Sequence, residues 1–400
     1  MVIKDFLIRE IFDSRGQSTV EVGISTKDGL AFYSSVPSGK SRGSKEAAVL
    51  DFKSASSIKN IKKLSAVKGQ NFASVKSFDD FLLKLDGTKS KKALGGNVML
   101  GFSMSFARAK AFEAGEELSE FLHKEFFKDI PLKKEWSPVI FSNLINGGEH
   151  AENNLDIQEY MVLVETSKGV KNSVKKLIYF YDSLGDLLKK KFRIPGILPI
   201  GDEGGYSLDF KDNFEPMVVL SDLIKKNGLA GSFRLGLDAA ASSFYSGNRY
   251  IFGGRKLTTE KLADTYLSAF KKFPMLYSIE DPFSESDPEG FCSVLSRVKG
   301  NMLVGDDLTV TNSSLVEKYA SIGAINGVII KPNQAGTVSE AASAILSARL
   351  RGVKTVISHR SGETEDVFII SLGKASDSYG LKIGSPTRER MLKFNELLRI

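Results

Sequence analysis

Cysteine and histidine are scarce in this chain. Its 400 residues include one cysteine, Cys292, and three histidines, His123, His150 and His359. A single cysteine excludes an intrachain disulfide framework and fits a reducing compartment. No zinc-finger spacing is present, so thiolate-based metal sites are excluded as well.

Long apolar runs are also missing. None approaches the roughly 18 residues that a membrane-spanning helix needs. The first ten residues, M-V-I-K-D-F-L-I-R-E, contain Asp5 and no long apolar core, so we expect no signal peptide. These observations predict a cytoplasmic protein without a membrane partner. The apolar share of 42% and charged share of 26% are those of an ordinary globular protein.

The charge balance is basic, with a formal net charge of +7. Such a balance favours anionic partners, which include nucleic acid, acidic membranes and phosphorylated metabolites. The lysines are scattered, however, and the densest runs, such as Lys189-Lys190-Lys191, fall in amphipathic helical patterns. We interpret them as solvated helix faces, and nucleic-acid binding is not required to explain them.

The N-terminal third changes period along its length. Residues 3–36 contain apolar and alternating runs separated by turn signals, which predict strands. From about residue 45 to 126 the period becomes helical, for example in A-A-V-L-D-F at 47–52 and in F-D-D-F-L-L-K-L-D-G. Strands followed by helices predict a small α+β domain over residues 1–127, and residues 128–134 are typical of a linker.

The remainder of the chain repeats a different pattern, in which a short apolar run ends in polar residues and a helical stretch usually follows. We count eight such runs, at 138–148, 156–165, 197–205, 233–240, 276–282, 302–307, 327–334 and 354–360. This alternation predicts a (β/α)8 barrel over residues 135–400. The first two runs are joined by a short segment without a helical pattern, which favours antiparallel pairing between them.

Chemically active residues lie at the polar ends of the later runs. They are Glu203, Asp238, Glu280, Asp306, Lys331 and His359, and each is separated from the next by about one strand and one helix. The carboxyl ends of the strands of such a barrel open on one face, where active sites form. The sequence therefore predicts that four acids, one lysine and one histidine share one mouth.

A single aspartate at a strand end is most often a helix cap, but four carboxylates together need another explanation. Uncompensated, they would repel and raise one another's pKa values. Lys331 and Arg360 offset only part of this charge. Oxygen ligands without cysteine are those that Mg²⁺ prefers over Zn²⁺, so we predict a bound Mg²⁺.

Motifs throughout the chain resemble the enolase family. They are D-S-R-G-Q-S-T-V-E-V near the start, N-G-G-E-H-A (146–151), Q-E-Y-M (158–161), G-D-E-G-G-Y (201–206), L-D-A-A-A-S (237–242), I-E-D-P-F (279–283), V-G-D-D-L-T-V-T-N (304–312), K-P-N-Q-A-G-T (331–337), S-H-R-S-G-E-T-E-D (358–366) and the final K-I-G-S-P-T-R-E-R-M-L-K-F-N-E-L-L-R-I. The combination is specific, and it covers essentially the whole chain in order. The fold that it implies is a small N-terminal α+β domain followed by an enolase-type (β/α)8 TIM-like barrel with an antiparallel start.

The resemblance implies a hydro-lyase that reversibly dehydrates 2-phospho-D-glycerate to phosphoenolpyruvate with two Mg²⁺ ions per active site. The implied ligands of the first ion are Asp238, Glu280 and Asp306. Lys331 would be the base, and its pKa would have to fall from about 10.4 toward about 7–8. A Lys or His base beside Mg²⁺ is the established pattern of this superfamily, and the nearby metal and Lys382 would supply the shift. Glu203 would be the acid, assisted by Glu159.

The same resemblance implies the substrate contacts. Arg360 and Ser361 would bind the phosphate, because an arginine fork matches phosphate oxygens. Lys382 would meet the substrate carboxylate, and Gln158 would be a further substrate-binding residue. His359 would lie against the substrate and His150 would belong to a mobile loop. We interpret the acids at 363, 365 and 366 as residues at a helix N-terminus and not as ligands.

An N-terminal loop, V-P-S-G-K-S-R-G at 36–43, completes the implied site. Ser41 matches the serine that ligates the second Mg²⁺, whereas Lys40 and Arg42 depart from the small residues usual in the family. Family members form homodimers or larger homo-oligomers, which places Arg15 and the strand containing Glu10 near the contact. They can also occur at the cell surface.

Two alternatives remain open from the sequence. One is a relative that acts on a phosphonate or an acid sugar. The other is a catalytically idle binding protein whose basic surface engages RNA or a cell-surface partner. An idle copy would be expected to lose some of Glu159, Glu203, Lys331 and Lys382, and all four are present.

Overall fold

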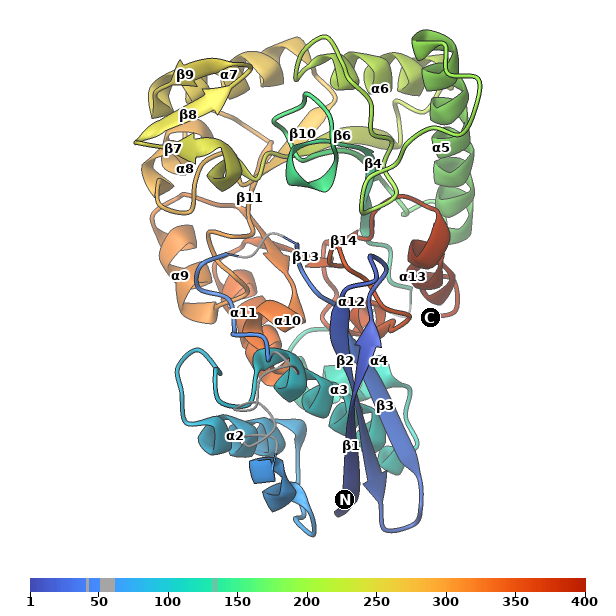
Figure 1. The fold of residues 1–400 in the computed structure, drawn as a ribbon, viewed down its shortest axis with the longest axis vertical. Coiled ribbons are helices and arrows are strands. Elements are labelled where there is room, and N and C mark those ends of the chain that lie inside the picture. The colour runs from blue at the N-terminus through green and yellow to red at the C-terminus, as the bar shows by residue number, and fades with distance from the viewer. Residues whose placement is uncertain (41–42, 51–61, 132, 134) are drawn as a thin grey trace.

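The structure is a computed structural model, which describes residues 1–40, 43–50, 62–131, 133 and 135–400. Figure 1 shows the N-terminal elements, coloured blue to cyan, at one end of the molecule and a barrel at the other. No helix in the described part of the chain has the length and apolarity needed to cross a bilayer.

The N-terminal part is an antiparallel sheet packed against helices. Its strands are β1 (Ile3–Phe12), β2 (Ser18–Thr26) and β3 (Ala31–Val36), in that order in the sheet. Its helical segments are η1 (Lys62–Val67), α2 (Val75–Asp86), α3 (Gly96–Ala114) and α4 (Leu118–Phe126). Helix α3 lies on β2 and β3, and most of its residues are buried because α2 and α4 pack on its other sides. The predicted strands of residues 3–36 are confirmed.

The helix predicted at residues 47–52 is wrong over residues 47–50, which form neither helix nor strand, and its last two residues lie outside the described residues. Tertiary hydrogen bonds use the backbone groups that a helix would need. Ala47 N donates to the carbonyl of Gln334 in the barrel, at 2.9 Å, and Leu50 N donates to the side chain of Asn97, also at 2.9 Å. The helical spacing here reflects apolar side chains that pack from an irregular segment.

Helix α2 shows how local sequence sets element ends. The Ser74 hydroxyl accepts a hydrogen bond from Ser77 N, and the Ser77 hydroxyl accepts one from Ser74 N, which is a capping box. Gly87 ends the helix with φ of 68°, a conformation that glycine adopts without steric cost.

The C-terminal part is a closed barrel of eight strands, as predicted. Its strands are β4 (Val139–Asn146), β5 (Glu159–Val164), β6 (Phe233–Asp238), β10 (Leu276–Glu280), β11 (Met302–Gly305), β12 (Gly327–Ile330), β13 (Lys354–Ser358) and β14 (Gly380–Lys382). Around the barrel their order is β10-β11-β12-β13-β14-β4-β5-β6. Strand β5 is antiparallel to both β4 and β6, and the other pairs are parallel. The predicted antiparallel start is therefore confirmed.

One of the eight predicted strands is wrong. Residues 197–205 form no barrel strand, and their pairing is limited to a bridge between Ile200 and Tyr206. The eighth strand is β14, whose three residues follow helix α12 (Phe368–Ala375) and close the barrel against β4. The apolar run at 197–205 forms a loop at the barrel mouth instead. Tyr206, the next residue, anchors this loop by backbone hydrogen bonds with Leu144 and Asn146 at the end of β4.

Helices surround the barrel, and a small meander is inserted in it. The helical segments are η2 (Gly148–His150), α5 (Val170–Phe192), α6 (Glu215–Lys226), η3 (Ala241–Phe244), α7 (Thr259–Lys272), α8 (Pro288–Leu295), α9 (Ser313–Ser321), α10 (Pro332–Ala335), α11 (Val338–Leu350), α12 (Phe368–Ala375), η4 (Arg388–Arg390) and α13 (Met391–Leu397). The meander consists of β7 (Tyr245–Ser246), β8 (Arg249–Phe252) and β9 (Arg255–Leu257).

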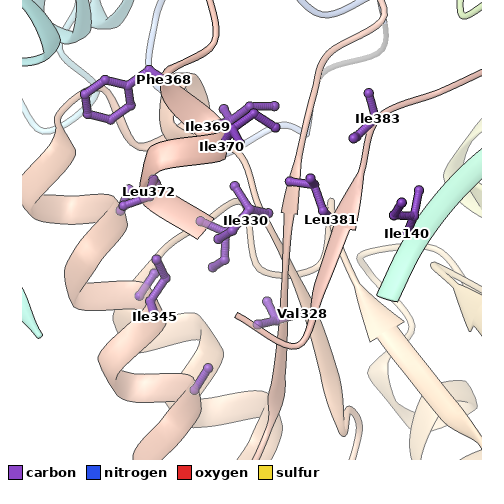
Figure 2. Close-up of a cluster of buried hydrophobic side chains, with 14 of the residues drawn as sticks. Ile140, Val328, Ile330, Ile345, Phe368, Ile369, Ile370, Leu372, Leu381 and Ile383 are labelled. Carbon is purple, nitrogen blue, oxygen red and sulfur yellow. The ribbon is translucent and has the colours of Figure 1, made fainter. Parts of the chain in front are cut away.

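An apolar layer between strands and helices fixes this arrangement. Figure 2 shows Val328 and Ile330 of β12 with Ile345 of α11 and Leu372 of α12. All four side chains are fully buried. Burial of one such side chain stabilises the fold by about 1.5–3 kcal/mol, so this layer holds the strand ends, and the side chains that follow them, in place.

The N-terminal part reaches the mouth of the barrel. Ser38, just after β3, forms an antiparallel bridge with Gly362, just after β13. Their backbone N–H groups and carbonyls exchange hydrogen bonds of 2.8 and 2.9 Å. Residues from both ends of the sequence are thereby brought to one place.

Candidate active site

The strand ends place the candidate residues at one face. Asp238 ends β6, Glu280 ends β10 and Lys382 ends β14, while Lys331 and His359 directly follow β12 and β13. Glu159 begins β5, but β5 runs in the opposite direction, so its first residue pairs with Asp238 at the same mouth. The antiparallel strand thus contributes its amino end where the parallel strands contribute their carboxyl ends.

A small polar cavity gathers most of the predicted site residues. It is lined by His150, Gln158, Glu159, Glu203, Asp238, Lys331, Ser358, His359, Arg360, Ser361 and Lys382. Glu280 and Asp306 do not line it directly, but each holds one of its lysines. Ser41 and Arg42 lie outside the described residues.

Lys382 is the cation of one group of buried acids. Its Nζ lies 2.9 Å from Asp238 Oδ2 and 2.9 Å from both carboxylate oxygens of Glu280. Glu159 Oε2 is 3.2 Å away. Burial alone would lower the pKa of Lys382, but these carboxylates raise it well above its ordinary value, so the lysine is charged.

Lys331 forms a second cation–acid group. Its Nζ donates to Asp306 Oδ2, and Gln334 Nε2 donates to Asp306 Oδ1 at 3.0 Å. Burial would lower the pKa of Lys331, yet Asp306 raises it above its ordinary value. The lowered pKa expected of a lysine base is therefore not found here, because the Asp306 carboxylate pairs with the ammonium group.

Two glutamates and two histidines form the opposite wall. Glu203 Oε1 lies 3.6 Å from His150 Nδ1 and 3.6 Å from His359 Nε2, and Asn143 Nδ2 donates to Glu203 Oε2 at 3.0 Å. Glu159 Oε1 is 3.8 Å from His150 Nδ1.

The two glutamates differ in protonation. Burial and the charge of Glu203 raise the pKa of Glu159 well above its usual value. Burial would also raise the pKa of Glu203, but His359 and His150 bring it well below the usual value. Two neighbouring buried carboxyls do not both ionise readily, so the pair retains one proton, mainly on Glu159.

The histidines are themselves neutral near pH 7. Burial lowers the pKa of His359 to about 4, and it also lowers the pKa of His150. Each neutral ring has one N–H to donate and one nitrogen that accepts. Nε2 of His359 faces Glu203 Oε1 at 3.6 Å, just beyond hydrogen-bond distance, and Nδ1 has no hydrogen-bond partner among the described residues.

Arg360 and Ser361, which the sequence predicts to bind the substrate phosphate, form one corner of the cavity (the anion-binding corner), and the N-terminal part completes it. The Arg360 guanidinium contacts Glu46 and donates to Asn333 Oδ1 at 3.0 Å. Lys40 N donates to the Ser361 hydroxyl at 2.8 Å. A Cβ at Gly39 would lie 1.8 Å from Arg360 Nη2, so only glycine permits this approach of the loop.

The carboxylate groups of the site are of the chemical type that binds a divalent cation. Burial and then the charge of Asp238 raise the pKa of Glu280 well above its ordinary value, and Lys382 opposes this shift. The donor atoms are carboxylate oxygens, as Mg²⁺ prefers. Asp238, Glu280 and Asp306 are each joined to a lysine, however. Among the described residues, two groups have possible metal-ligand atoms within 4.8 Å of one another. They are His150–Glu159–Glu203 and Asp281–Asp306–Asp307, and neither is the predicted set of Asp238, Glu280 and Asp306.

Sequence reasoning missed several residues that shape the site. They are Glu46, Asn143, Asn333, Gln334 and Arg390. Asn333 and Gln334 lie in the K-P-N-Q-A-G-T motif and could have been found there, but Glu46 carries no signal because its partner Arg360 is 314 residues away. The expectation for the acids after Ser361 is correct only for Asp366, which accepts from Phe368 N at the start of α12. Glu363 instead accepts from Arg360 N, and Glu365 accepts from the Ser35 hydroxyl.

Comparison with known proteins agrees with this geometry. The family model described as "Enolase, N-terminal domain" matches residues 3–122, and that described as "Enolase, C-terminal TIM barrel domain" matches residues 134–400. The chain is 38% identical to an enolase of Anaplasma marginale over 100% of this chain and 93% of the relative. It is 37% identical to an enolase of Methanocaldococcus jannaschii (100% and 94%) and 35% identical to one of Aeropyrum pernix (100% and 95%). With both family models matched in order and relatives aligned over the entire chain, the chain belongs to the enolase family.

Proposed function

We propose that the cavity described above is the active site at which this chain dehydrates 2-phospho-D-glycerate to phosphoenolpyruvate, with Lys331 as base and the Glu159–Glu203 pair as acid. Enolases are hydro-lyases of the phosphopyruvate hydratase class, and their general reaction depends on a divalent metal and a phosphorylated acid substrate. The individual roles are those that the family resemblance implies, and the geometry of this chain supports them.

The observation that carries the proposal is the position of base and acid in the barrel. Lys331 follows β12, and Glu159 begins β5, which is four strands away in either direction around the eight-stranded barrel. The two groups therefore stand on opposite walls of one cavity. Such an arrangement suits an elimination in which a proton leaves one face of the substrate and hydroxide leaves the other.

The remaining residues would hold and orient the substrate. Arg360 would bind the phosphate as a fork, with the Ser361 hydroxyl as a further donor. Lys382 would face the substrate carboxylate. The neutral ring of His359 would donate to, or accept from, the substrate between these two anchors, and Gln158 and His150 would close the cavity wall.

Proton transfer follows from the pKa directions. Lys331 must give up a proton before it can act as a base, which requires that Asp306 be drawn away from its ammonium group. Mg²⁺, when bound by Asp238, Glu280 and Asp306, would polarise the substrate carboxylate and so stabilise the negative charge left by proton removal. On the opposite wall Glu159 holds the proton that the pair would pass to the departing hydroxide, and Glu203 accepts a hydrogen bond from Asn143 Nδ2 that helps to keep the pair in place.

Several further features belong to the same proposal. Residues 1–127 would form a capping domain and residues 135–400 the catalytic barrel. A second Mg²⁺ would use Ser41. The protein would be a cytoplasmic homodimer, with contact near β1, where Leu7 and Phe12 are 44% and 67% exposed.

The test is absorbance at 240 nm with 2-phospho-D-glycerate, with and without Mg²⁺. We expect a Mg²⁺-dependent rise with the wild type and a rise about 10²–10⁴-fold slower with Lys331→Ala, since this is what a positioned base contributes. Lys318→Ala, on the outer helix α9, is the matched control and should keep full activity. Failure of the wild type to react would refute the proposed substrate, and phosphonate or acid-sugar substrates would then be tried.

A further inference from the structure

Arg390 is a fully buried arginine that the proposed reaction does not use. Its side chain is 0% exposed and is the largest among the fully buried side chains of the described residues. It lies at the end of η4, in the C-terminal segment, and its Nε is 3.3 Å from the carboxylate of Glu389. A buried cation is costly unless its hydrogen bonds are satisfied, so its partners indicate what it does.

The partners are backbone carbonyls of two separate loops of the site. Nη1 donates to Arg360 O at 2.9 Å, and Nη2 donates to Ser361 O at 2.7 Å. Nη2 also donates to Asp202 O at 3.1 Å. The first two carbonyls belong to the anion-binding corner, and the third immediately precedes Glu203.

A second buried cation supports the same corner. Lys393, also 0% exposed, is paired with the Glu363 carboxylate and donates to Thr364 O. Glu363 in turn accepts from Arg360 N at 2.9 Å. Two residues of the C-terminal segment, Arg390 and Lys393, therefore support the anion-binding corner, Arg390 through its backbone carbonyls and Lys393 through Glu363. Only Arg390 of these two also binds the loop that carries Glu203.

We infer that Arg390 is a positioning residue, which fixes the anion-binding corner at Arg360–Ser361 relative to Glu203 of the Glu159–Glu203 acid pair. This inference rests on the proposed function, since it concerns the roles given to those residues. The guanidinium group suits the task because its planar fork has several N–H donors in fixed directions and can reach three carbonyls at once. A lysine at this position has one nitrogen and cannot span the two loops in the same way.

Two loops tied to one rigid group move together. The substrate bridges them, since its phosphate would lie at Arg360 and its leaving hydroxide at the Glu159–Glu203 pair. A displacement of about 1 Å between reacting groups costs roughly 10²-fold in rate. Loss of the Arg390 bridge should therefore lower kcat as well as raise KM, although Arg390 does not line the cavity.

The test compares Arg390→Lys with Arg388→Lys, an exposed arginine of the same turn, in the full-length protein. We expect kcat/KM to fall about 100-fold in Arg390→Lys, from the misplacement estimate above, and to stay at the wild-type value in the control. Hydrogen exchange followed by mass spectrometry should show faster exchange of residues 359–364 and 201–205 in Arg390→Lys, with the barrel strands unchanged. Added guanidinium ion should restore part of the activity of Arg390→Ala, whereas the same concentration of NaCl should not.

Either of two results would overturn the inference. One is unchanged exchange of both loops in Arg390→Lys, and the other is faster exchange throughout the chain with a lowered Tm, which would make Arg390 a general stabilising residue. If Arg390→Lys does not fold, Arg390→Ala is prepared with guanidinium ion, and failure of that ion to restore folding or activity also overturns the inference. The exchange measurement remains decisive even if the wild type does not turn over 2-phospho-D-glycerate, so failure of the proposed function is told apart from failure of this inference.

Discussion

The carboxylate of Glu46 meets the guanidinium of Arg360 at two points, with Oε2 3.1 Å from Nη1 and Oε1 3.2 Å from Nη2. The two residues come from the N-terminal part and from the barrel, and both are almost fully buried. Burial would lower the pKa of Arg360, but Glu46 raises it above its ordinary value. A phosphate that binds Arg360 must therefore either displace the Glu46 carboxylate from the guanidinium group or bind beside it, against its negative charge.

Replacement of this carboxylate should strengthen anion binding. In Glu46→Gln the guanidinium keeps a polar neighbour of the same size but loses a negative charge, and we expect inorganic phosphate to bind roughly tenfold more tightly, which corresponds to about 1.4 kcal/mol. Isothermal titration calorimetry at fixed ionic strength measures the change. Glu46→Asp, which keeps the charge, is the control. Weaker phosphate binding by Glu46→Gln would show instead that Glu46 holds Arg360 in its binding position.

Metal binding should stabilise the fold, because the ligand carboxylates converge only in the native state. Addition of Mg²⁺ at about 100 times its Kd should stabilise the wild type by about 2.7 kcal/mol, and EDTA should reverse this. In Asp306→Asn the stabilisation should be largely lost. Thermal unfolding with and without Mg²⁺ measures it, and Asp264→Asn, whose side chain is 71% exposed, should behave like the wild type. Equal stabilisation of Asp306→Asn would exclude Asp306 as a ligand.

A buried acid between the two parts of the chain should make stability depend on pH. Asp79 of α2 accepts from the backbone N and hydroxyl of Ser339, which lies in the first turn of α11, at 3.0 and 2.6 Å. Burial raises the pKa of Asp79 from 3.8 to about 7, although the hydrogen bonds from Ser339 oppose this shift. The folded state thus holds the proton more tightly than the unfolded state.

The sign of the effect follows from this difference. As pH rises from about 4 to about 7, the unfolded chain loses the Asp79 proton first, so the free energy of unfolding falls by up to about 4 kcal/mol and then stays level. Asp79→Asn should remove this part of the pH dependence, so its stability relative to the wild type should increase over the same interval. Urea unfolding at several pH values measures the difference, which would be constant with pH if Asp79 ionised normally.

A glycine beside the proposed base should not tolerate a side chain. Gly336 ends α10, which directly follows Lys331, and has φ of +98°. A Cβ there would lie 2.6 Å from Lys91 Cδ and 3.3 Å from Gly96 Cα, both in the N-terminal part. We expect Gly336→Ala to destabilise the protein by about 3 kcal/mol, from backbone strain of about 1–2 kcal/mol plus the forced shift of its neighbours.

The control for this substitution is Gly352→Ala. Gly352 also has a positive φ, +67°, but no atom of the described residues lies within 4 Å of the point that its Cβ would occupy. Gly352→Ala should therefore lower the free energy of unfolding by the backbone strain alone. Urea unfolding of both variants separates this strain from the forced shift of neighbouring atoms, and kcat shows whether that shift reaches Lys331. Equal losses of stability would mean that the approach of the two parts at Gly336 is not tight.

Much of the site could be predicted from the chain alone. Residues at the ends of apolar runs, such as Asp238, Lys331 and His359, lie at one mouth as expected, because strand ends and their spacing are local properties. The closed barrel and its antiparallel start follow from the same alternation. Glu203 also reaches this mouth, but by a different route, since it lies on a loop that folds back over β4 and not at a strand end.

Short or irregular segments could not be predicted. Strand β14 has only three residues, so its period is not visible in the sequence, whereas the longer apolar run at 197–205 has the pattern of a strand without forming one. Residues 47–50 have helical spacing but bond to Gln334 and Asn97. In each case hydrogen bonds to distant residues decided the local structure.

The sequence by itself therefore determined the family, the barrel and the set of chemically active residues, because these depend on residue type and on spacing within one strand and one helix. Tertiary structure alone decided the partners of those residues. Glu46 meets Arg360 across 314 positions, Lys382 meets Asp238 across 144, and Arg390 joins two loops that no local pattern connects. The pKa directions at the site depend on these contacts, since an ionisable group responds to the charges and the burial around it and not to its neighbours in sequence.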